Sequence, residues 1–178
     1  GAVVNSRDNN PIDPRCETAN WPNIAVVVDG SASITADQWT AMRSALVGTN
    51  NGSLLDTLAT TNARVSTLIF GINNYTGGTP ALPSGQGGWR QRTPLAVSNT
   101  TSRTTLANSI PTTRPNQTGT NWQSGLQAVA QETQFYDLVL FITDGAPNMV
   151  LSSLNADGTS SGVGAAENET NVSLRALE

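Results

Sequence analysis

Short apolar runs place the tightest constraint on how this chain folds. They lie at 23–28, 64–70 and 137–143 and read NIAVVV, RVSTLIF and DLVLFIT. A strand with one solvated face alternates apolar and polar residues, whereas the first and last of these runs are almost wholly apolar. We therefore predict strands that are buried on both faces, as in a parallel sheet.

Helical patterns separate these runs. Thr35 and Gln38 have the spacing of a capping box, which predicts a helix over 36–47. Leu126, Val129 and Ala130 predict the apolar stripe of another helix, at 122–133. Further predictions are helices at 53–59, 101–110 and 165–177, an edge strand at 93–97, and loops at 71–92 and 111–120. Strands that alternate with helices indicate an α/β fold with a mainly parallel sheet.

Composition excludes several classes of function. The 178 residues suit one domain, at 23–178, behind an extended lead-in at 1–22. The chain has no His and no Lys, which removes the commonest general base and the P-loop lysine. Its nine basic residues are scattered arginines and the net charge is −4, so we expect no nucleic-acid partner. No run approaches about 18 apolar residues, so we expect no membrane insertion.

Two of the predicted strands end in the same way, as VVVDG at 26–30 and FITDG at 141–145. In a parallel sheet both Asp29 and Asp144 lie at the carboxyl edge, where open α/β sheets bind ligands. Asp29, Ser31 and Ser33 alternate, so an extended backbone would direct them to one side. Carboxylate and hydroxyl oxygens suit a hard cation such as Mg²⁺. Solvated polar turns remain the alternative interpretation of each motif.

The order of three segments resembles the von Willebrand factor A domain with its metal-ion-dependent adhesion site. These segments are NIAVVVDGSAS, TGTNWQSGLQAV and DLVLFITDGAPN, at 23–33, 118–129 and 137–148. The resemblance covers about residues 23–178 and implies a Rossmann-like, doubly wound sheet flanked by helices. It also implies Mg²⁺, or alternatively Mn²⁺ or Ca²⁺, bound by Asp29, Ser31, Ser33, Thr120 and Asp144. Thr120 is chosen because it stands five residues before Gly125.

The resemblance also implies a function, which is adhesion rather than catalysis. In this family a carboxylate from an Asp or Glu of a protein partner completes the metal site. The phrases GTNW and LFITDG are most similar to Gram-positive, actinobacterial surface and pilus-tip adhesins. We therefore expect an extracellular domain on the cell wall or pilus tip. Its expected partners are a host matrix or receptor protein, or other pilus subunits.

Two other functions stay open. The same site could serve an intracellular assembly or regulate an ATP-driven machine, and a metal-dependent hydrolase would need a base that the sequence does not offer. The family usually continues with two more strands and a last helix, so we expect a C-terminally incomplete domain whose 137–143 strand is exposed at an edge.

Three aromatic residues are candidate ligand contacts. Trp122 follows the presumed metal ligand Thr120, and packing against the start of the helix is an equally good interpretation of it. Tyr75 and Trp89 lie in the predicted 71–92 loop, which could border the metal face and shape specificity. An ordinary surface loop is the alternative for both.

Overall fold

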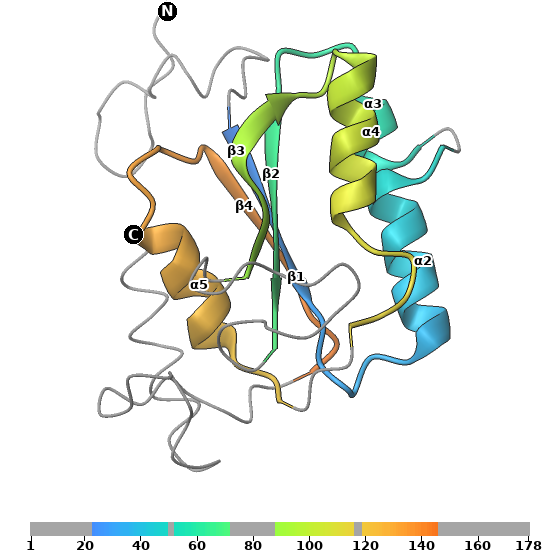
Figure 1. Ribbon diagram of the computed structural model, residues 1–178, viewed down its shortest axis with the longest axis vertical. Helices are drawn as coiled ribbons and strands as arrows, with labels where there is room; N and C mark the ends of the chain where they lie inside the picture. Colours follow the sequence, from blue (N-terminus) through green and yellow to red (C-terminus); the bar gives the residue numbers. More distant parts are fainter. Residues whose placement is uncertain (1–22, 50–51, 72–87, 116–118, 146–178) are drawn as a thin grey trace, which may run out of the picture.

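The computed structural model describes residues 23–49, 52–71, 88–115 and 119–145, which form a four-stranded sheet in the order β3-β2-β1-β4 with helices on both sides (Figure 1). Strands β1 (Asn23–Asp29), β2 (Arg64–Phe70) and β4 (Leu138–Ile142) are parallel, with β1 between the other two. Strand β3 (Trp89–Ala96) pairs antiparallel with β2. The predicted α/β fold with a mainly parallel sheet is confirmed.

The helices divide between the two faces of the sheet. Helices α2 (Ala36–Val47), α3 (Leu54–Leu58) and α4 (Thr100–Ser109) cover one face, and α5 (Trp122–Ala130) covers the other (Figure 1). The predicted capping box is present at the start of α2, because the Thr35 hydroxyl accepts from the Gln38 amide at 3.2 Å and the Gln38 side chain accepts from the Thr35 amide at 2.8 Å. Among the described residues, no helix has the length and apolar character needed to cross a membrane.

Strand β1 is buried on both faces, as its sequence predicts. Ile24, Val26 and Val28 pack in the core under α2, α3 and α4. Ala25 and Val27 pack in the opposite core with residues of α5 and with Phe70. An unbroken apolar run is therefore what this central position requires.

The structure corrects several element predictions. Strand β3 begins at Trp89 rather than at 93, because Trp89 is buried and pairs with Leu68 of β2. Helix α5 ends at Ala130, which is exposed, and Ala128 lies in the core instead. Strand β4 is half-buried rather than buried on both faces; among the described strands only β1 pairs with it, so it lies at an edge of the described sheet, as expected for the 137–143 strand. The 1–22 lead-in and the 165–177 helix lie outside the described residues.

Candidate metal centre

The parallel strands β1 and β4 bring their carboxyl ends to one edge of the sheet. Val28 is in register with Ile142, so the residues that follow the two strands are neighbours. Asp29 is fully buried there, and Asp144 is exposed. The Gly30 amide donates to the Phe70 carbonyl at 2.7 Å, which ties the turn after β1 to the end of β2.

Both carboxylate oxygens of Asp29 accept hydrogen bonds from protein groups. Oδ1 accepts from the Ser31 amide at 2.8 Å, and Oδ2 accepts from the Thr143 hydroxyl at 2.7 Å. Burial raises the pKa of Asp29; hydrogen bonds from Ser31 and Thr143 lower it, and the charge of Asp144 raises it again. Among the described residues that influence this carboxylate, none carries a positive charge, and a bound cation would supply one.

Hydroxyl groups connect the two carboxylates. Ser31 Oγ and Ser33 Oγ are 2.8 Å apart, and the Ser33 hydroxyl donates to Asp144 Oδ1 at 3.1 Å. A continuous chain of polar contacts thus runs from Asp29 through both serines to Asp144. Ser33 and Asp144, which are 111 positions apart in sequence, meet at this edge of the sheet, as the two strand-ending motifs predict.

The loop that carries Thr120 is held at the same edge. Its neighbour Asn121 donates its amide to the Gly71 carbonyl, directly after β2, at 3.0 Å. The Asn121 side chain accepts from the Ser124 amide at 3.0 Å and so caps the first turn of α5. Thr120 is 4% exposed. The structure therefore places this candidate ligand at the edge where β1 and β2 end.

Two residues that contact the candidate site, Thr143 and Arg114, were not predicted from the sequence. Thr143, the residue before Asp144, holds Asp29 in place; its position at the end of an apolar strand is a signal that could have identified it. Arg114 donates from Nη1 to the Ser31 carbonyl at 3.2 Å and to the Pro115 carbonyl at 3.0 Å. Nothing in the sequence distinguishes Arg114 from the other scattered arginines.

The aromatic candidates lie differently from the prediction. Trp89 begins β3 instead of lying in a loop; it is 3% exposed and stacks on Tyr136 with ring centroids 5.9 Å apart, and its contact with a ligand stays a prediction. Trp122 packs edge-to-face on Phe141 at 5.6 Å, which fits the packing interpretation; its buried indole N–H has no hydrogen-bond partner within the described part of the chain. Tyr75 lies outside the described residues.

The donor set fits a hard divalent cation. All the candidate ligands offer oxygen, from carboxylates or hydroxyls, which is the chemistry that Mg²⁺ and Ca²⁺ select. Within the ranges that the structure describes, no group of three or more His, Cys, Asp or Glu side chains gathers to hold a metal. A cation bound at this edge would therefore depend on hydroxyls as well as on carboxylates.

Comparison with known proteins agrees with the fold. Residues 23–176 match the family model described as the von Willebrand factor type A domain. The open-conformation crystal structure of the pilus adhesin SpaC from Lactobacillus rhamnosus GG is similar, with 22% identity and a TM-score of 0.53 over 79% of this chain. A second SpaC crystal structure gives 19% identity and a TM-score of 0.49, also over 79% of this chain. The chain spans only 17% and 18% of those two adhesin chains. No curated protein matches the chain.

Proposed function

Because this chain belongs to the von Willebrand factor type A domain family, we propose that it is an adhesion domain that binds a partner protein through a divalent cation. The observation that carries the proposal is the chain of contacts that joins Asp29, Ser31, Ser33 and Asp144 at the carboxyl edge of the sheet. We place the domain on a bacterial cell surface, in the cell wall or at a pilus tip, a location that the similarity to a pilus adhesin supports.

Asp29, Ser31, Ser33, Thr120 and Asp144 are the residues that would hold the ion, with Mg²⁺ favoured over Mn²⁺ or Ca²⁺. When bound, the ion supplies an electron-poor centre with an open position for a carboxylate oxygen. Ser31, Ser33 and Thr120 contribute neutral oxygens, which leave much of the positive charge uncompensated. Thr143 and the Ser31 amide hold the Asp29 carboxylate in a fixed orientation.

The partner in this proposal is a protein with an exposed Asp or Glu, such as a host matrix protein, a receptor or another pilus subunit. Its carboxylate provides the charge that the hydroxyl-rich site lacks. Binding rather than catalysis is favoured because the chain contains neither His nor Lys to act as a base.

Calorimetric titration of the protein with MgCl₂ tests the metal site. Asp144→Asn is expected to weaken Mg²⁺ binding at least about tenfold, because it removes an anionic ligand. Asp137→Asn is the matched control: Asp137 precedes β4 at the opposite end of the strand, where its carboxylate accepts from the Asn23 amide at 3.1 Å. Equal losses in both variants, or no loss in Asp144→Asn, would contradict the proposed ligand set.

Two probes test the binding function. Acetate, the simplest carboxylate, is expected to shift NMR signals of the residues around Asp29 and Asp144 in Mg²⁺ and not in EDTA. Beads coated with the protein are expected to adhere to at least one of collagen, fibrinogen and fibronectin in Mg²⁺ and to detach in EDTA. Adhesion that EDTA leaves unchanged would refute a metal-dependent mechanism.

A further inference from the structure

A groove of about 380 Å³ borders the candidate metal centre. One wall is formed by the segment that leads into α2, including Ala32, Ile34 and Thr35, and the other by Thr112, Thr113 and Arg114. Ala32 lies between the two serines of the metal centre, and Arg114 donates to the carbonyl of Ser31. A molecule bound in the groove would therefore be next to the proposed metal.

Hydrogen bonds fix the two walls relative to each other. Trp39, a lining residue that is 1% exposed, donates from its indole N–H to the Pro111 carbonyl at 2.9 Å. Arg43 of the same helix donates from Nε to the Ile110 carbonyl at 2.7 Å. Together with the bond from Arg114 to Ser31, these contacts tie α2 and the segment before it to residues 110–114 at three points. The groove is consequently a built feature of the fold rather than a gap between loose loops.

The groove carries the positive charge of Arg114, and no acidic residue lines it within the described part of the chain. Of the described residues that line it, Arg114 alone is charged, and Asp37, in the first turn of α2, is not among them. Within the described ranges, Arg114 donates from Nη1 to two backbone carbonyls, those of Ser31 and Pro115. Among the described residues, the ion pair joins Arg92 and Glu132, and no carboxylate pairs with Arg114. Exposed Thr112 and Thr113 add hydroxyl donors beside this cation.

We propose that the groove binds a second acidic side chain of the partner protein, next to the carboxylate that completes the metal site. This inference rests on the proposed function and extends it to specificity: the domain recognises two neighbouring carboxylates. A guanidinium can offer parallel N–H donors to a carboxylate, which makes Arg114 the contact residue. A partner with a single accessible Asp or Glu then binds more weakly than one with an acidic pair.

The test compares dicarboxylates with their half-amides by NMR titration in saturating Mg²⁺. The probes are the α,ω-dicarboxylates from succinate to suberate, so that one length spans the metal and Arg114. For that length we expect the dicarboxylate to bind at least about tenfold more tightly than its half-amide, the gain typical of a charge-assisted pair. A dicarboxylate has two equivalent ends, and this statistical factor accounts for only about twofold of the tighter binding.

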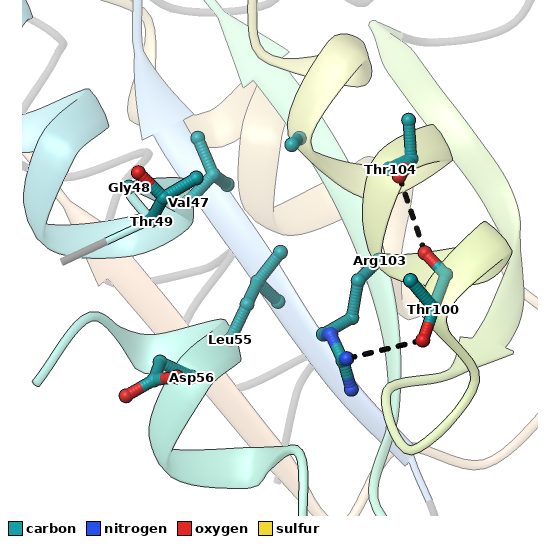
Figure 2. Close-up of a pocket in the computed structure, with 9 residues that line it drawn as sticks. Val47, Gly48, Thr49, Leu55, Asp56, Thr100, Arg103 and Thr104 are labelled. Carbon is teal, nitrogen blue, oxygen red and sulfur yellow. Dashed lines mark hydrogen bonds between the residues drawn. The ribbon is translucent and has the colours of Figure 1, made fainter. Parts of the chain in front are cut away.

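Two variants test whether the groove causes the tighter binding of the dicarboxylate. Arg114→Gln is expected to reduce the ratio of the half-amide's dissociation constant to that of the dicarboxylate to about two, because no cation remains for the second carboxylate. Thr113→Glu places a competing carboxylate in the groove and should have the same effect while the contacts of Arg114 stay in place. Arg103→Gln is the control, since Arg103 also donates to a backbone carbonyl, that of Val97, but lines a separate pocket of about 300 Å³ between α2, α3 and α4 (Figure 2).

The outcomes separate this inference from the proposed function. Metal-dependent acetate binding with a ratio near two for every dicarboxylate length would overturn the second subsite and leave the metal site standing. A large ratio that survives in both Arg114→Gln and Thr113→Glu would place the second carboxylate elsewhere and also overturn it. Acetate binding that does not depend on Mg²⁺ would refute the proposed function, and the second subsite with it.

Discussion

Asp29 is the most constrained side chain of the candidate site, because it is fully buried and both of its oxygens accept hydrogen bonds. Its identity and position follow from the sequence, since a carboxylate directly after a buried strand must lie at the sheet edge. Its partner Thr143 directly follows β4, more than a hundred residues later in the sequence. Contacts of that range depend on strand register, which the sequence does not reveal.

Thr143→Val tests whether this second layer of contacts matters for metal binding. Valine keeps the shape of threonine but removes the hydroxyl that donates to Asp29 Oδ2. We expect Mg²⁺ affinity, measured by calorimetry, to fall by about 10-fold or more, as for other groups that orient a metal ligand. The exposed Thr105→Val in α4 is the control. Unchanged affinity in Thr143→Val would show that the Ser31 amide alone orients Asp29.

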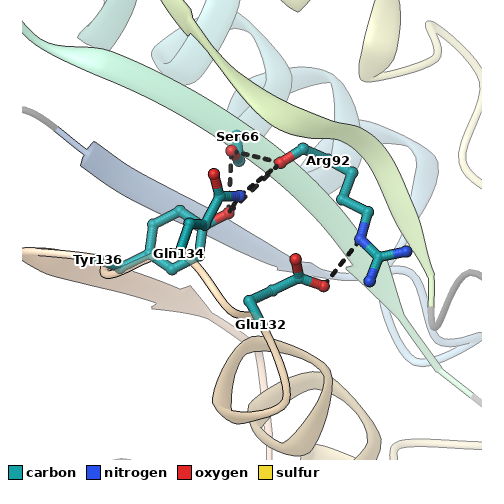
Figure 3. A network of polar contacts seen from close by, with 5 residues as sticks. All are labelled: Ser66, Arg92, Glu132, Gln134 and Tyr136. Carbon is teal, nitrogen blue, oxygen red and sulfur yellow. Dashed lines mark hydrogen bonds and ion pairs between the residues drawn. The ribbon is translucent and has the colours of Figure 1, made fainter.

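Tyr136 carries the second prediction at this scale, in a polar network that links β2, β3 and the segment after α5 (Figure 3). Its hydroxyl accepts from Gln134 at 2.7 Å and donates to Ser66 at 3.1 Å. Burial is the largest influence and raises the pKa of Tyr136 above the ordinary value of 10.0. The folded state therefore favours the neutral phenol. Its stabilising effect is complete below about pH 10 and is lost as the pH rises through the higher folded pKa.

Unfolding of wild type and Tyr136→Phe by urea from pH 8 to pH 11 measures this effect. We expect Tyr136→Phe to be less stable by about 1 kcal/mol at pH 8, because it loses hydrogen bonds, and the difference to shrink at alkaline pH. Because the chain has no Lys, no lysine side chain titrates in this pH range and affects the comparison. A difference that stays constant up to pH 11 would mean that Tyr136 ionises alike in folded and unfolded chains.

At the scale of elements, apolar patterns located the central strands well and the element ends less well. The run at 23–28 predicts β1 because a strand buried on both faces needs no alternation. The sequence did not predict that β3 starts at Trp89, because WRQR has no apolar alternation. The packing of Trp89 on Tyr136 explains this start. In α5 the core-facing residues include Ala128 rather than Ala130, and the helix lies in close contact with the sheet.

Gly125 explains that close contact. A Cβ at this position would lie 3.1 Å from the Phe70 ring and 3.2 Å from Val27, so α5 sits closer to the sheet than a side chain allows. Phe70 has little freedom to move, because it stacks on Phe141 with ring centroids 4.8 Å apart. The helix that follows the Thr120 loop is thus positioned by the missing side chain of Gly125.

Gly125→Ala is therefore expected to destabilise the protein by about 1 kcal/mol or more, although alanine is the better helix former. Chemical unfolding provides the measurement. Thr105→Ala, at an exposed position of α4, gains helix propensity without a steric clash and should leave stability unchanged or slightly higher. A stabilised Gly125→Ala protein would show that the α5–sheet contact adjusts freely.

At the scale of the whole molecule, the order and direction of the strands bring separate loops together into one candidate metal centre. Parallel pairing of β1 with β2 and β4 brings three strand ends to a single edge, where the loops that carry the Asp, Ser and Thr oxygens gather. The sequence predicts that edge and the residues on it. It does not predict the groove beside it, because Arg114 and the walls around Trp39 depend on packing between segments far apart in sequence.

The most direct measurement of the central claim uses Mn²⁺ as a paramagnetic probe in NMR. Mn²⁺ shares the oxygen ligands of Mg²⁺ and broadens the signals of nearby nuclei. We predict that substoichiometric Mn²⁺ broadens the amide signals of residues 29–33, 119–121 and 143–145, that excess Mg²⁺ reverses the broadening, and that signals at the opposite edge, around Asn23 and Arg64, stay sharp. Broadening that is centred elsewhere, or spread evenly over the protein, would contradict a metal centre at the carboxyl edge of the sheet.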